Sequence, residues 1–302
     1  MNRFPNGARV CFVGDSITHN GLFMAKIAAY YREHFKDAGV EFYNCGISGG
    51  TLGNALRILK EEVLIYDPTH IVLMIGVNDS RRDLLSEPAS EERYRLLLEA
   101  YETYGKNLEA FYQVTRERGI ALILCTPVPY AEYQKEAEAP LCGAYALLLG
   151  YADFVRAFAK EKGLALCDYH TALTAALQTE ELYRPDCVHP TERGHYRMAQ
   201  TFLAFQGLSL AEDKPLPTEM AEWYATVQKL RNVVATEYFT VPDYTEMDRQ
   251  ARYAAVTARL GAVEEGKEEM RDYFVNLMRD YQTDALQRDE FVRAAKAFMK
   301  QK

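Results

Sequence analysis

The feature that most constrains this fold is an alternation of short β-branched segments with longer amphipathic segments, which runs from residue 8 to residue 205. Such alternation is typical of βαβ units, in which parallel strands form a central sheet and helices cover both faces. We therefore expect an α/β domain of three layers, α/β/α, around a parallel five-stranded sheet. The expected strands are Ala8–Val13, Val40–Tyr43, His70–Ile75, Ile120–Cys125 and Leu164–Asp168.

The amphipathic segments at both ends of this region have helical spacing. The first carries apolar residues from Leu22 to Phe35 and is expected to end at Gly39, because glycine readily takes the left-handed conformation that ends many helices. The last begins near Thr191 and places Met198 and Phe202 on one face. Both helices should pack against the sheet.

The composition changes after Gly207, where a polar, proline-containing stretch indicates a linker or domain edge. The residues beyond it are rich in Ala, Glu, Arg, Met and Tyr and show no strand alternation. We expect helices over 219–238, about 243–262 and about 266–300, with their aromatic side chains, Trp223 among them, packed in a core. The alternatives are that they pack over the rim of the ligand site or between subunits, giving a homo-oligomer. The predicted division is an α/β domain over 1–207, a linker over 208–218 and an all-helical extension over 219–302.

Bulk properties exclude several classes of protein. The net charge of −8 and the scattered Lys and Arg residues disfavour a nucleic-acid partner. No stretch approaches the roughly 18 consecutive apolar residues of a membrane span, so no membrane association is expected. The N-terminus shows no secretory signal, which predicts a cytoplasmic location. The six cysteines and six histidines lack metal-ligand spacing, and no dinucleotide or P-loop glycine motif follows a strand, so neither a metal nor another cofactor is expected.

Polar motifs follow three of the predicted strands, at the edge of the sheet where open α/β folds bind ligands, and a fourth motif precedes the last helix. The first strand runs into Gly14-Asp15-Ser16, and the second into the glycine loop that begins Asn44-Cys45-Gly46. The third ends in Gly76-Val77-Asn78-Asp79, and Asp186-Cys187-Val188-His189 precedes the last helix. Each motif alone also fits a turn or a helix cap, but four of them at one sheet edge indicate a site.

Together these four blocks resemble, in the same order, those of the GDSL/SGNH hydrolase family, over roughly residues 8 to 205. The resemblance implies a flavodoxin-like α/β/α domain and a serine esterase. It implies that Ser16 is the nucleophile, His189 its base and Asp186 the group that orients the imidazole. It also implies an oxyanion hole formed by Ser16 N–H, Gly46 N–H and the Asn78 amide.

The loops near these blocks are polar, which favours small polar esters over long acyl chains. Asp15, Asp79, Arg81 and Tyr130 are the candidate substrate-binding residues, although Asp15 also fits a turn carboxylate and Arg81 a solvated helix start. The blocks are most similar to those of intracellular carbohydrate acetylesterases of the family, which implies an acetylated saccharide as substrate. A lysophospholipase or thioesterase, and a catalytically idle carbohydrate-binding protein, are the alternatives.

Overall fold

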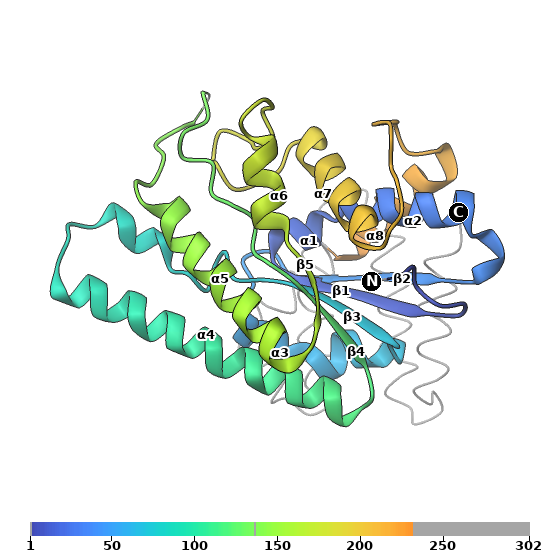
Figure 1. Cartoon of the computed structure of the whole chain (residues 1–302), viewed down its shortest axis with the longest axis horizontal. Helices are drawn as coiled ribbons and strands as arrows, with labels where there is room; N and C mark the ends of the chain where they lie inside the picture. The colour runs from blue at the N-terminus through green and yellow to red at the C-terminus, as the bar shows by residue number, and fades with distance from the viewer. Residues whose placement is uncertain (1, 136, 232–302) are drawn as a thin grey trace, which may run out of the picture.

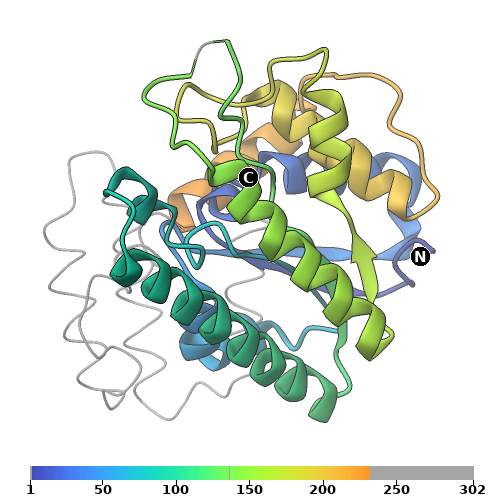
Figure 2. The same cartoon turned by 60° about the vertical axis from the view of Figure 1, so that its left-hand side comes forward.

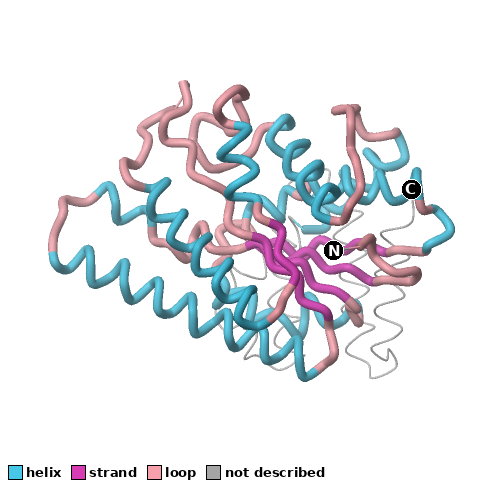
Figure 3. The backbone as a smooth tube through the Cα atoms, in the orientation of Figure 1, coloured by secondary structure: helices cyan, strands magenta, loops and turns pink. Residues whose placement is uncertain are grey.

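The computed structural model describes residues 2–135 and 137–231, where five parallel strands form one sheet (Figure 3). The sheet order is β2-β1-β3-β4-β5, and each predicted strand is found within three residues of its expected bounds, the largest difference being the later end of β2. The strands are β1 (Arg9–Gly14), β2 (Glu41–Gly46), β3 (His70–Met74), β4 (Ala121–Cys125) and β5 (Ala165–Cys167). This sheet and its flanking helices confirm the predicted fold class.

Helices cover both faces of the sheet, as Figure 1 shows. One layer contains α3 (Leu52–Ile58), α4 (Glu91–Glu117) and α5 (Ala144–Lys162). The other contains α1 (Ser16–Asn20), α2 (Leu22–His34), α6 (Tyr169–Ala176) and α7 (Glu192–Phe205). Short 3-10 or π turns occur at η1 (Lys36–Ala38), η2 (Leu59–Val63), η3 (Leu64–Tyr66) and η4 (Arg82–Ser86). No helix among the described residues has the length and apolar character of a membrane span.

Alternation along the strands builds two cores, one on each face of the sheet. In β1, Cys11 and Val13 belong to the core under α3, α4 and α5, whereas Val10 and Phe12 belong to the core under α2 and α7. Successive side chains of a strand point to opposite faces, so an apolar run such as this one requires cover on both sides. The buried β1 thereby fixes the position of the loop that follows it.

The sheet order places a topological switch point between β1 and β3. The chain passes from β1 to the edge strand β2 and then returns to β3 on the other side of β1. Connections therefore leave the carboxyl ends of β1 and β3 in opposite directions, which opens a crevice where α/β folds bind ligands. The Ser16 and Asn78 loops follow these two strands.

The part of the predicted extension that the structure describes packs on the α/β domain. Residues 208–217 have no regular secondary structure, and α8 (Thr218–Arg231) follows them. This helix contacts α1, α2 and the edge strand β2, and it lies beside α2 in Figure 1 and in the turned view of Figure 2. Met220 joins one core and Val227 the other, so α8 covers the open edge of the sheet. The helices predicted beyond residue 231 lie outside the described residues.

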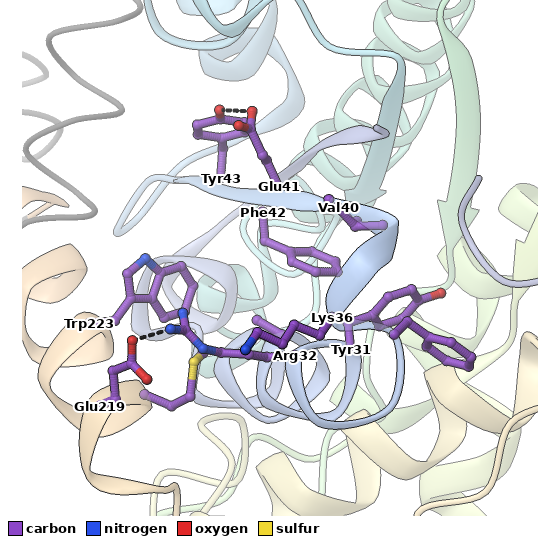
Figure 4. Close-up of a pocket in the computed structure, with 13 residues that line it drawn as sticks. Tyr31, Arg32, Lys36, Val40, Glu41, Phe42, Tyr43, Glu219 and Trp223 are labelled. Carbon is purple, nitrogen blue, oxygen red and sulfur yellow. Dashed lines mark hydrogen bonds and ion pairs between the residues drawn. The ribbon is translucent and has the colours of Figure 1, made fainter. Parts of the chain in front are cut away.

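A cavity of about 470 Å³ lies between α2, β2 and α8 (Figure 4). Trp223 lines it, together with Arg32 and Glu219, which form an ion pair across it. None of the predicted site residues lines this cavity, so it is not the candidate site despite its volume.

Candidate active site

Ser16 is presented by the turn between β1 and α1. Asp15 caps α1 with a side-chain oxygen that accepts the Ile17 N–H at 3.0 Å, so Ser16 becomes the first helical residue. Gly14 is required at the end of β1, because a Cβ there would lie 2.3 Å from the Met74 carbonyl oxygen. No described residue accepts a hydrogen bond from the Ser16 N–H, which remains available to a ligand.

A continuous chain of hydrogen bonds joins the three predicted triad residues. Ser16 Oγ lies 2.8 Å from His189 Nε2, and His189 Nδ1 lies 2.7 Å from Asp186 Oδ2. The other oxygen of Asp186 accepts the backbone N–H groups of Val188 and His189 at 3.0 and 2.9 Å. Asp186 therefore fixes both the tight turn and the imidazole within it. This is the geometry needed for a hydroxyl nucleophile with an oriented base.

Electrostatics keep Asp186 ionised in this arrangement. Partial burial would raise the pKa of this carboxyl, but the two backbone N–H groups and the imidazole outweigh burial and hold its pKa below the ordinary value. An ionised carboxylate accepts the Nδ1 proton, which leaves Nε2 as the acceptor toward Ser16.

The segment after β4 supports the turn that carries His189. Cys187 in this turn is buried and has a positive φ of 65°, a conformation uncommon for a residue with a side chain. The segment after β4 holds it there, because Ala131 N–H donates to the Cys187 carbonyl oxygen at 2.8 Å. Tyr130 is buried, and its hydroxyl accepts the Leu141 N–H at 3.1 Å. This bond ties Tyr130 to the loop that precedes α5, and its contact with substrate stays a prediction.

The Asn78 amide belongs to the loop after β3, whereas Ser16 belongs to the loop after β1. Its Nδ2 donates one hydrogen to the Gly50 carbonyl oxygen at 2.9 Å, which leaves the second hydrogen for a ligand. Arg82 holds the same loop, since its Nη1 donates to the Val77 carbonyl oxygen at 2.7 Å and approaches Asn78 Oδ1 at 3.5 Å. Arg82 was not among the predicted site residues.

The predicted role of Gly46 in the oxyanion hole requires correction. Its N–H donates to Asn44 Oδ1 at 2.9 Å and is buried, so it is not available to a substrate. Gly46 instead permits close packing, because a Cβ there would lie 2.1 Å from His19 N. Gly49, three residues later, is exposed with φ of 74°, and no described residue accepts its N–H. Gly49 is the better donor from this loop.

Asp15 and Asp79 lie beneath the site and not at its surface. Asp79 is 9% exposed, and its Oδ1 accepts the Leu52 N–H at 2.9 Å, which holds the start of α3 beside the Gly49 loop. Burial raises the pKa of Asp79 to about 7 and that of Asp15 to about 6. Their predicted contacts with substrate are corrected, because both carboxyls support backbone turns.

Arg81 was a candidate substrate-binding residue, but its side chain does not reach into the crevice. Its backbone has a positive φ of 49°, and its half-exposed side chain forms an ion pair with Asp83 at 3.1 Å. The neighbouring Arg82 takes the position beside Asn78. Among residues 2–135 and 137–231, no three His, Cys, Asp or Glu side chains form a group that could hold a metal ion.

A small cavity adjoins the reactive pair, and we call it the Ser16 cavity. Its volume is about 180 Å³, below the roughly 300 Å³ at which pockets for drug-sized ligands begin. Polar side chains dominate its wall, which consists of Ser16, Ile17, His19, Asn20, Arg184, His189, Pro190, His195 and Gln228. Gln228 belongs to α8, and no motif in the sequence pointed to it.

Comparisons with known proteins identify the family. A model described as the GDSL-like Lipase/Acylhydrolase family matches residues 12–197. An acetylxylan esterase from Geobacillus stearothermophilus is 26% identical over 220 residues, which make up 67% of this chain and 94% of that protein. A crystal structure of an acetylxylan esterase from the same organism has a TM-score of 0.56 and 23% identity over 69% of this chain and 99% of that chain.

A gut microbial diltiazem-metabolizing enzyme has a similar fold, with a TM-score of 0.61 and 24% identity. The match covers 68% of this chain, and the chain spans about half, 48%, of that enzyme. These structural similarities show the fold, whereas the family model spans more than half of the sequence and includes the Ser16 and His189 blocks. The protein therefore belongs to the GDSL-like lipase/acylhydrolase family and is a carboxylic ester hydrolase.

Proposed function

We propose that this protein removes O-acetyl groups from carbohydrates, with Ser16, His189 and Asp186 as a catalytic triad. The observation that carries the proposal is the unbroken hydrogen-bond chain from Ser16 Oγ through His189 to Asp186, 2.8 and 2.7 Å long at its two links. The acetylxylan esterase relative supports the choice of an acetylated carbohydrate, since its match covers 94% of that protein.

The first half of the reaction forms an acetyl-enzyme. Ser16 Oγ attacks the acetyl carbonyl carbon while its proton passes to His189 Nε2. The carbonyl oxygen becomes an oxyanion, which accepts hydrogen bonds from the Ser16 N–H, the Gly49 N–H and the second hydrogen of Asn78 Nδ2. When the tetrahedral intermediate collapses, the bond to the sugar oxygen breaks and His189 returns the proton to that oxygen.

The second half releases acetate. A water molecule gives a proton to His189 Nε2 and attacks the acetyl carbonyl carbon through the same oxyanion hole. Collapse returns the proton to Ser16 Oγ and frees acetate, so the enzyme is regenerated. Asp186 keeps the imidazole in the required tautomer through both halves and stabilises the imidazolium that forms in each.

Seven of the nine residues that line the Ser16 cavity have polar side chains, which suits a substrate that bears hydroxyl groups. A lysophospholipase or a thioesterase for long acyl chains is the first alternative, and the preferred acyl length distinguishes it. A catalytically idle carbohydrate-binding protein has no need for a serine, an imidazole and a carboxylate aligned at hydrogen-bond distances.

Acetate release from acetylated mono-, oligo- and polysaccharides tests the proposal, with the Ser16→Ala variant as the blank. We expect release from at least one saccharide class and none from the variant, while circular dichroism shows both proteins folded. Comparison of 4-nitrophenyl acetate with the octanoate separates the alternatives, because a preference for octanoate would favour a lipase or thioesterase. Wild-type turnover by the serine variant would refute the triad.

A further inference from the structure

Helix α8 closes one side of the Ser16 cavity although it lies outside the family match, which ends at residue 197. Gln228 is its contribution to the wall. The Gln228 Nε2 donates to the His19 carbonyl oxygen at 2.7 Å and also to the Asn20 carbonyl oxygen, the last two carbonyls of α1. Tyr224, one turn earlier on α8, donates its hydroxyl hydrogen to Asn20 Oδ1 at 3.3 Å. The helix that begins with Ser16 is therefore attached to α8.

We propose that the Ser16 cavity is the subsite for the alcohol portion of the ester, and that Gln228 is a residue that determines specificity for alcohols bearing hydroxyl groups. The inference rests on the proposed function, because it assigns the part of an acetylated saccharide that this cavity receives.

The positions of the reactive groups decide which part of the ester enters the cavity. The candidate oxyanion donors Gly49 and Asn78 do not line it, so the carbonyl oxygen of the substrate faces away from this cavity. The sugar oxygen must receive its proton from His189 Nε2, and His189 lines the cavity next to Ser16. The alcohol side of the ester is thereby directed toward α8.

The polar groups of the cavity suit hydroxyl groups. Both Nε2 hydrogens of Gln228 are donated to carbonyl oxygens, so its Oε1 is left as an acceptor for a hydroxyl hydrogen. His195 is buried, and its Nδ1 has no hydrogen-bond partner among the described residues. Arg184 also lines the cavity and is exposed, and no described carboxylate forms an ion pair with it. Hydrogen-bond acceptors and a guanidinium donor in one cavity match a group that both donates and accepts, as a sugar hydroxyl does.

Burial lowers the pKa of His195 to about 3, so this imidazole is neutral at physiological pH. A neutral imidazole has one ring nitrogen that accepts a hydrogen bond. His195 therefore adds no positive charge to that of Arg184, which is consistent with an uncharged, hydroxyl-rich ligand.

The test compares two acetyl esters in the full chain: a partially acetylated xylo-oligosaccharide, and 4-nitrophenyl acetate, whose alcohol carries no additional hydroxyl. In Gln228→Met, which keeps the length of the side chain, the ratio of kcat/KM for the saccharide over that for 4-nitrophenyl acetate should fall about 3- to 10-fold, the value of one uncharged hydrogen bond. Arg184→Met, at an exposed position of the same cavity, should lower the same ratio. Glu222→Gln, on the exposed face of α8, is the control and should leave the ratio unchanged.

The two kinds of failure are distinguishable. If Gln228→Met and Arg184→Met lower kcat/KM for both esters by the same factor, or leave both unaltered, the cavity is not the subsite for the alcohol and the inference is refuted. If Ser16→Ala keeps wild-type turnover on both esters, the proposed function itself fails. If Gln228→Met does not fold, the ratio in Arg184→Met alone decides the outcome.

Discussion

Replacing Arg231 with alanine should release α8 from the sheet before the rest of the protein unfolds. The Arg231 and Glu62 side chains are only 2% and 5% exposed, and Arg231 Nη1 lies 2.9 Å from Glu62 Oε2. Arg231 Nη2 also donates to the Gly46 carbonyl oxygen at 3.0 Å. The substitution leaves a buried carboxylate without this guanidinium, which typically costs about 3–5 kcal/mol. A cost of this size falls on the docking of α8, since only this helix carries Arg231.

Urea unfolding followed by two signals measures the effect. Trp223 is the single tryptophan of the chain, and it packs against both cores from α8, so its fluorescence reports on this helix. Circular dichroism reports on the helices of the whole protein. In Arg231→Ala the fluorescence midpoint should move down by about 1–2 M urea, ahead of the circular dichroism midpoint. In the wild type we expect the two midpoints to lie closer together.

The matched control removes both charges. The double variant Arg231→Met with Glu62→Leu leaves no uncompensated charge, and exchange of a buried ion pair for apolar groups is often neutral or stabilising. Its fluorescence midpoint should therefore return toward that of the wild type. If the single and double variants unfold identically, or if Arg231→Ala leaves the fluorescence midpoint unaltered, the argument from buried charge is wrong.

Three further predictions concern the site. Asn78→Ala should lower kcat about 10²- to 10³-fold through the loss of one oxyanion donor, and an effect on KM alone would contradict that role. Asp186→Asn should lower kcat about 10²- to 10⁴-fold at neutral pH without unfolding the protein, because the amide no longer fixes the imidazole tautomer; activity near that of the wild type would exclude the role. Burial raises the folded-state pKa of Asp79 to about 7. Between about pH 4 and 7 the folded state therefore retains a proton that the unfolded chain has lost. The free energy of unfolding falls as the pH rises through that window. Asp79→Asn should abolish this fall, so its unfolding free energy relative to wild type should rise by up to roughly 4 kcal/mol between pH 4 and 8; a constant difference in urea titrations would count against it.

The strands could be predicted because their signals are local. β1 is a continuous apolar run because both of its faces are buried, and the predicted triad residues Ser16, Asp186 and His189 lie in short blocks at strand or helix ends. The choice between Gly46 and Gly49 could not be made from the sequence. It depends on the Asn44 side chain, which accepts the Gly46 N–H at 2.9 Å.

Other errors arose where a loop residue turns inward. Asp79 follows a strand, as many ligand-binding carboxylates do. Its oxygen instead accepts the Leu52 N–H at the start of α3. Arg81 and Arg82 are indistinguishable by composition, and the left-handed backbone at Arg81 decides which of them lies beside Asn78. Gln228 reaches the cavity from a helix with no sequence motif, and only tertiary packing brings it there.

The contact between α8 and β2 bears on where the protein can be shortened. β2 is an outer strand of the sheet, and its outward N–H and C=O groups would form a template for strand addition if α8 were removed. A fragment cut at the predicted boundary after residue 207 would keep Ser16, Asp186 and His189, yet it would gain a route to self-association. The smallest practical enzyme is therefore expected to extend at least through Arg231.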